Sequence, residues 1–150
     1  MPNRSVHIAV STPAGVFYAA HKSQFQSDLS RFVEGCGGLI GGLIGGLLPD
    51  LIDPPTWPGH RSLGHGFCPV AMGSVVWQHR LDSMQEDLRQ KADGHRWQAT
   101  QCQDPILVAW HSLMETACRL LAGFLAGFFA GYLSHVALDF ATPRCLPFVC

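Results

Sequence analysis

Two ionisable residues, His135 and Asp139, close a long apolar stretch near the carboxyl end of the chain. They are four positions apart, so on a helix their side chains would lie next to each other on one face. An imidazole and a carboxylate at this spacing can bind one metal ion, or the carboxylate can orient the imidazole. A core histidine hydrogen-bonded to an acidic neighbour would give the same pattern. Ionisable groups beside so apolar a segment are energetically costly, which favours a functional site.

Further candidate ligands come from other parts of the chain. Asp50 and Asp53 follow the apolar stretch 35–48, although a carboxylate there could equally belong to a turn or a helix end. His60 and His65 are five positions apart, which separates them by about 140° on a helix. In a loop, however, both imidazoles could turn towards one centre.

Arg61 and His7 complete the set of candidates. The guanidinium of Arg61 could pair with a carboxylate or bind a substrate phosphate bidentately. His7 lies inside the first apolar segment, where a single histidine is ordinarily a hydrogen-bonded core residue. Together the candidates supply imidazole and carboxylate without thiolate, which suits Zn²⁺, Mn²⁺ or Fe²⁺. One or two such ions would activate a bound water and polarise an ester, so the sequence predicts a hydrolytic metal site.

Three apolar blocks must position these residues, and all three are predicted to be helical. The first is 6–20, with Pro13 near a helix start or at a kink. The second, 35–48, repeats Gly-Gly-Leu-Ile, which leaves a helix face almost without side chains and lets another helix approach closely. The third, 120–138, carries no formal charge over about 28 Å of helix, close to the roughly 30 Å of a bilayer core.

Glycines recur at every fourth position of the third block, on one stripe of the helix: Gly123, Gly127 and Gly131. This stripe and the glycine-rich second block indicate close helix packing, which is typical of membrane proteins. The buried helix of a soluble bundle would give the same pattern. We expect a membrane-associated chain with lipid as its partner and with glycine-rich faces that could form a homo-oligomer.

Two polar segments lie between the second and third blocks. Residues 49–66 are rich in proline and glycine and are predicted to form a loop, followed by a helix after Pro69. Residues 78–104 form a hydrophilic connecting segment, in which we expect a helix end, a loop at Asp93-Gly94 and an approach to Pro105. His79 and His95 lie in this segment, where an exposed imidazole needs no partner.

Composition limits what the chain can be. Its 150 residues are enough for one domain, 1–150, and too few for two. Charged residues make up only 14% and the net charge is −1, which argues against disorder and provides no basic surface for nucleic acid. Six cysteines contain no C-x-x-C pair, so we expect them to be reduced and expect no zinc site built on thiolates.

The combined motifs resemble those of a known family. Leu48-Pro-Asp50, His60-Arg-Ser-Leu-Gly-His65 and Gly131-Tyr-Leu-Ser-His-Val-Ala-Leu-Asp139 resemble the YdjM-like family of membrane-bound, metal-dependent hydrolases. The resemblance covers most of the chain outside 78–104. A more distant similarity is to the all-helical fold of zinc-dependent phospholipase C and P1 nuclease.

The resemblance implies a ligand set and an acid–base group. His65 would be a ligand or the general acid–base, and the implied metal ligands are His7, Asp50, His60, His135 and Asp139. Gly66 stands where the family usually has a serine, so a role for that hydroxyl is absent. No second H-x-x-x-H or H…E set follows the last of these ligands, which leaves a centre of one or two metal ions.

The sequence therefore predicts an all-α, membrane-associated helical bundle with a polar metal site at one end. The predicted function is metal-dependent hydrolysis of a phosphoester or lipid ester, with zinc foremost and manganese or iron as alternatives, in a bacterial inner membrane. His65 would exchange protons, Arg61 would steady a substrate oxyanion and Asp53 would orient a ligand. A non-enzymatic membrane protein with a structural metal or an assembly role is the main alternative. A metal or proton transporter is the third.

Overall fold

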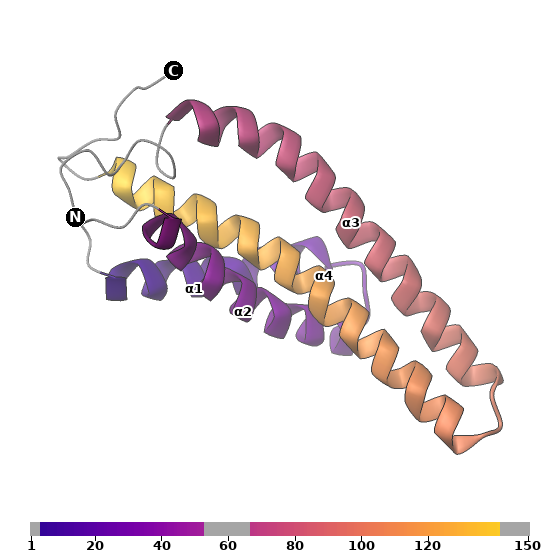
Figure 1. Ribbon diagram of the computed structural model, residues 1–150. Helices are drawn as coiled ribbons and strands as arrows, with labels where there is room; N and C mark the ends of the chain where they lie inside the picture. The colour runs from indigo at the N-terminus through magenta and orange to yellow at the C-terminus, as the bar shows by residue number, and fades with distance from the viewer. Residues whose placement is uncertain (1–3, 53–66, 142–150) are drawn as a thin grey trace.

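The computed structural model describes residues 4–52 and 67–141, and the chain is all-helical there, as predicted (Figure 1). Its four helices are α1 (Arg4–Lys22), α2 (Asp28–Ile52), α3 (Phe67–Gln101) and α4 (Pro105–Phe140). The part of the chain that the structure describes has no strand. Of these helices, α2 and α4 are long and apolar enough to cross a membrane.

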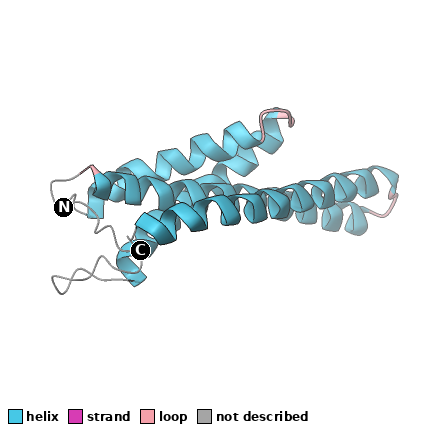
Figure 2. Cartoon of the chain, turned by 90° about the horizontal axis from the view of Figure 1, so that it is seen from above, coloured by secondary structure: helices cyan, strands magenta, loops and turns pink. Residues whose placement is uncertain are grey.

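The helices form a bundle in which α2 and α4 run parallel, and α1 and α3 run in the opposite direction (Figure 1). The first two helices cover only part of the length of α4. The hairpin of α3 and α4 therefore extends well beyond them at one end (Figure 2). At the other end the start of α1 lies beside the final turns of α2 and α4, so this end collects the polar residues that follow the apolar blocks.

The contact between α2 and α4 is built from glycines, as the repeat predicts. A methyl group added at Gly127 would lie against the carbonyl oxygen of Gly38 and 2.6 Å from its Cα. The same closeness holds for the other members of both stripes, Gly37, Gly41 and Gly45 on α2 and Gly123 and Gly131 on α4. Because the two backbones are in contact, any side chain in these stripes would push the helices apart.

A second glycine face of α2 contacts α1. A methyl group added at Gly15 would lie 2.7 Å from the Cα of Gly42, and one added at Gly38 would lie 2.6 Å from the Cβ of Ala19. Both glycine faces of α2 are thus covered by helices of the same chain.

The predicted loop at Asp93-Gly94 is wrong, because α3 continues through both residues to Gln101. A single glycine costs a helix only about 1 kcal/mol, and a methyl group added at Gly94 would meet nothing within 4 Å. Tertiary contacts outweigh this cost: the carboxylate of Asp93 accepts a 2.7 Å bond from Arg119 of α4. The predicted helix boundary at Pro105 is right, since Asp104 caps α4 through a 2.8 Å bond from the N–H of Ile106.

Ion pairs join three helices about halfway along α4, and the pair of Glu34 with Arg89 is buried on both sides. Glu34 of α2 is 0% exposed and receives a two-pronged bond from Arg89 of α3, whose Nη2 lies 2.7 Å from Oε2. Arg119 of α4 is 2% exposed and bonds Asp93 of α3 and Glu115 of its own helix. Removing either Glu34 or Arg89 would strand a buried charge, which typically costs about 3–5 kcal/mol.

The predicted loop 49–66 is wrong for residues 49–52, and residues 53–66 lie outside the described part of the chain. The helix α2 includes Pro49 and Asp50 and ends at Ile52. Pro49 is buried near the end of the helix, where the loss of one backbone hydrogen bond is tolerated in exchange for packing. Pro13 likewise lies inside α1 rather than at its start. Cys36, Cys102 and Cys118 are free thiols, in agreement with the expectation for these three.

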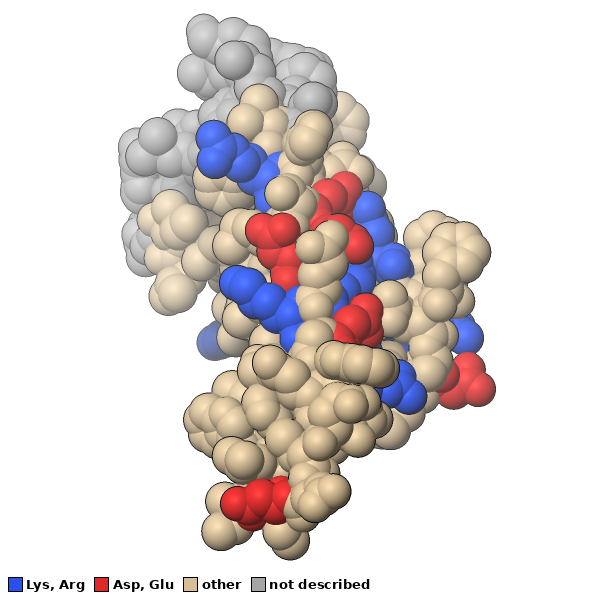
Figure 3. Space-filling model, turned by 90° about the vertical axis from the view of Figure 1, so that its right-hand side faces the viewer, with Lys and Arg blue, Asp and Glu red and all other residues tan. Residues whose placement is uncertain are grey.

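Charge is distributed unevenly over the surface. Seen end-on from the side of the hairpin, acidic and basic side chains gather in a mixed band, while the projecting end is almost free of charge (Figure 3). The outer face of α3 exposes charged residues, Arg80, Glu86, Asp87 and Lys91 among them. Large apolar side chains are exposed on all four helices, among them Phe17 on α1, Ile40 on α2, Trp97 on α3 and Trp110 on α4.

Candidate metal centre

His135 is fixed by a backbone contact that crosses the α2–α4 interface. Its Nδ1 lies 2.6 Å from the carbonyl oxygen of Gly46. A carbonyl oxygen can only accept, so Nδ1 carries the hydrogen and donates it. The ring is 0% exposed, and its other nitrogen, Nε2, faces the carboxylates of Asp50 and Asp139. Metal-binding histidines are oriented in this way, by a hydrogen bond from the nitrogen that does not bind the metal.

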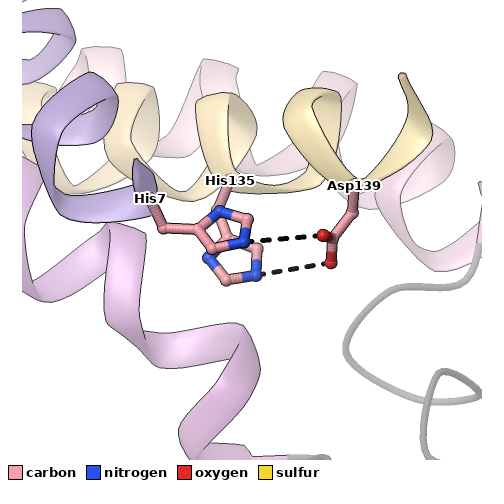
Figure 4. A group of neighbouring side chains, drawn as sticks. All are labelled: His7, His135 and Asp139. Carbon is pink, nitrogen blue, oxygen red and sulfur yellow. Dashed lines mark ion pairs between the residues drawn. The ribbon is translucent and has the colours of Figure 1, made fainter. Parts of the chain in front are cut away.

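Asp139 lies one turn after His135 and faces both this ring and the ring of His7 from α1 (Figure 4). Nε2 of His7 is 3.5 Å from Oδ1 of Asp139, and Nε2 of His135 is 3.6 Å from Oδ2 of the same carboxylate. The two rings stack with their centroids 3.8 Å apart. The predicted neighbourhood of His135 and Asp139 on one face is therefore present, and α1 adds the imidazole from the far end of the sequence.

Asp50 brings a second carboxylate from α2. Its Oδ1 is 3.6 Å from Nε2 of His135, and its side chain is 30% exposed. The three other side chains of the cluster, His7, His135 and Asp139, are at most 3% exposed. Asp50 is thus the member of this group that connects the buried cluster with the surface.

The geometry fits a cation among these side chains. The three residues His7, His135 and Asp139 each offer a ligand atom, and these atoms lie within 4.8 Å of one another. The N···O separations of 3.5–3.6 Å exceed the usual 2.7–3.2 Å of an N–H···O hydrogen bond. They are close to the roughly 3.3 Å between two ligand atoms at about 2.0–2.1 Å on a tetrahedral zinc.

Charge leads to the same conclusion. With the hydrogen of the His135 imidazole on Nδ1, a neutral ring turns the lone pair of Nε2 towards the carboxylates of Asp50 and Asp139. A lone pair facing two carboxylates is repulsive unless a positive charge lies between them. A proton on Nε2 or a metal ion can supply that charge, and the donor set of imidazole and carboxylate suits zinc.

Reasoning from sequence missed the role of Gly46. Its carbonyl reaches His135 because the glycine faces bring α2 and α4 into backbone contact, and Ser11 of α1 fills the space beside it. Ser11 is buried one turn after His7, and its hydroxyl has no hydrogen-bond partner in the described part of the chain. The only signal in the sequence was the glycine repeat, which predicts closeness but not which carbonyl is used.

Four predicted site residues lie outside the described residues: Asp53, His60, Arg61 and His65. Their proposed roles stay predictions. Two histidines expected to need no partner behave differently from each other. His79 is exposed on α3, whereas His95 contacts His111 of α4. The expectation was therefore wrong for His95, because the connecting segment is a helix packed along α4 and not a free loop.

Comparison with models of known families, with curated proteins and with solved structures finds no match to this chain.

Proposed function

We propose that this chain is a membrane-bound, metal-dependent hydrolase. The observation that carries the proposal is the convergence of His7, His135 and Asp139, with Asp50 beside them, at one end of the bundle. Isolated ionisable groups in such apolar surroundings would be costly, and a shared cation offsets that cost. Asp50, His135 and Asp139 also belong to the motifs that resemble the YdjM-like family.

Each residue of the cluster would have its own role in binding the metal. His7, His135 and Asp139 would hold the metal from inside the bundle, and Gly46 would keep His135 in the tautomer that leaves Nε2 free to bind. Asp50, at the surface, would complete the sphere on the side that substrate can reach. A bound zinc would supply a water of lowered pKa and a Lewis acid for an ester oxygen.

The segment 53–66 would provide the remaining groups of the reaction. By the resemblance, His60 is a further ligand, His65 transfers a proton to the leaving group, Arg61 steadies the oxyanion and Asp53 orients a ligand. One or two metal ions are compatible with this set. Zinc suits the imidazoles best, and manganese or iron is the alternative.

The membrane and the class of substrate belong to the same proposal. Two helices, α2 and α4, are long and apolar enough to cross a bilayer, and the site lies at the end of both. A site at that position would meet lipid headgroups, so we propose a phosphoester or lipid ester as substrate and a bacterial inner membrane as location.

Burial of the cluster favours a second candidate function. A structural metal site is closed by protein ligands, and three of the four side chains here are almost fully buried. In that case the metal would fasten α1 to α4 and the chain would serve assembly rather than catalysis.

The first experiment measures metal content and turnover together. The full chain is purified in detergent without chelators, and metal is determined by elemental analysis beside cleavage of phosphoester and lipid-ester substrates. His135→Ala and Asp139→Ala should each lose the metal of this site and all hydrolysis, because each removes a ligand. His79→Ala, an exposed histidine on α3, is the matched control and should change neither.

The outcomes separate the candidates. Wild-type protein without metal would overturn the hydrolase proposal. Metal that is retained but supports no cleavage on any substrate of a broad panel would favour the structural site. Ion flux in proteoliposomes without hydrolysis would instead favour transport.

A further inference from the structure

A second pair of histidines lies far from the candidate metal centre, near the turn that joins α3 to α4. His95 of α3 and His111 of α4 place their Nδ1 atoms 3.1 Å apart. Their ring centroids are 5.3 Å apart and the planes are inclined by 34°. His111 and His135 are on the same helix and 24 positions apart, which corresponds to about 36 Å. The two sites are therefore independent.

The hairpin holds the two imidazoles in place. Only residues 102–104 separate α3 from α4, and Asp104 caps the second helix. On the other side of the histidines, Asp93 bonds Arg119 at 2.7 Å. Contacts on both sides thus fix the spacing of the helices, so the two rings can bind a common partner without a movement of the backbone.

The distance fits a shared metal ion. Two nitrogens bound at about 2.0–2.1 Å to a tetrahedral metal lie about 3.3 Å apart, within a few tenths of an ångström of the observed separation. Without a metal, one Nδ1–H can donate to the other Nδ1, which keeps the rings facing each other. The pair is therefore arranged in advance for a cation that prefers imidazole.

We propose that His95 and His111 form a second metal-binding site, selective for borderline transition metals such as Zn²⁺, Ni²⁺ or Cu²⁺. Imidazole nitrogens favour these ions over Mg²⁺ and Ca²⁺, which require oxygen ligands. Among the described residues no third histidine, cysteine or carboxylate joins the pair in a tight cluster, so water or an external ligand fills the remaining positions. Both side chains are half-buried, which leaves the metal accessible from solvent.

The test is a zinc titration of the full chain in detergent after removal of metal with a chelator. Wild-type protein should bind one more equivalent than His95→Ala or His111→Ala, or bind that equivalent at least tenfold more tightly. The double variant should be no weaker than either single variant, because one imidazole alone cannot form the site. His79→Ala should bind as wild type does, and Mg²⁺ should not compete.

A structural readout accompanies the titration. Zinc that bridges α3 and α4 should raise the melting temperature of wild-type protein, and this rise should disappear in both single variants. Equal zinc binding by wild type, His95→Ala and His111→Ala would overturn the proposal. Asp139→Ala, which tests the other site, should retain the zinc-dependent rise, so the failure of one proposal is distinguishable from the failure of the other.

Discussion

At the scale of single residues, the candidate metal centre depends on which nitrogen of His135 carries the hydrogen. The bond to the carbonyl of Gly46 assigns that hydrogen to Nδ1 and leaves Nε2 to face two carboxylates. No side chain could set this tautomer as reliably, because a backbone carbonyl neither ionises nor changes rotamer. The backbone contact between α2 and α4 therefore also sets the tautomer of His135.

Substitution of Asp50 tests whether this carboxylate contributes to metal binding at the candidate centre. Asp50→Asn keeps the shape of the side chain and removes its charge 3.6 Å from Nε2 of His135. We expect zinc affinity to fall about 10–100-fold, the range seen when a partner of a metal site is lost, while the buried ligands still bind. Competition with a fluorescent chelator measures the change. Asp87→Asn on the exposed face of α3 is the control, and wild-type affinity in Asp50→Asn would remove Asp50 from the site.

Part of this site could be predicted from the sequence. The spacing of His135 and Asp139 placed both side chains on one helix face, and the structure has them there. The approach of His7 depends on α1 packing antiparallel to α4, which a local pattern does not determine. The contact of His95 with His111 escaped prediction for a related reason: it required α3 to be one helix alongside α4.

At the scale of elements, the glycine stripes can be tested by adding a single methyl group. In Gly127→Ala the new Cβ would lie against the backbone of Gly38, so the helices must separate. We expect a loss of about 1–3 kcal/mol of stability, as in other overpacked interiors. Unfolding in detergent with a chemical denaturant measures it.

Gly94→Ala is the matched control, because its Cβ would meet nothing within 4 Å and the residue is helical. This change should stabilise the protein by about 0.5–1 kcal/mol through lower entropy of the unfolded chain. If both substitutions had the same effect, close packing at Gly127 would not explain the repeat.

The helices themselves were predictable where apolar periodicity was strong, and less so where charges dominate. The segment 78–104 was predicted to be a connection because its residues are polar and include Asp93-Gly94. It is nevertheless helical as far as Gln101 and packs along α4, and its buried Arg89 pairs with Glu34 of α2. Since ion pairs between helices leave no local pattern, this interface could not be read from the segment alone.

At the scale of the whole molecule, the prediction concerns the membrane. Two helices apolar enough to cross a bilayer, and apolar side chains exposed on α1 and α2, lead us to expect an integral protein. The chain should remain with the membrane fraction through washes with high salt and alkaline buffer, and only detergent should release it. Stable monomer from the soluble fraction without detergent would contradict the membrane assignment and leave the metal centre untouched.

The parallel course of α2 and α4 has a topological consequence. A chain that crosses a bilayer twice in the same direction must travel back between the two crossings, and α3 lies on that return path. Its outer face exposes Arg80, Glu86 and Lys91, which hydrocarbon does not tolerate. The ring of lipid around the bundle would therefore be incomplete: acyl chains would contact the exposed apolar side chains of α1, α2 and α4, and the charged outer face of α3 would face water or protein.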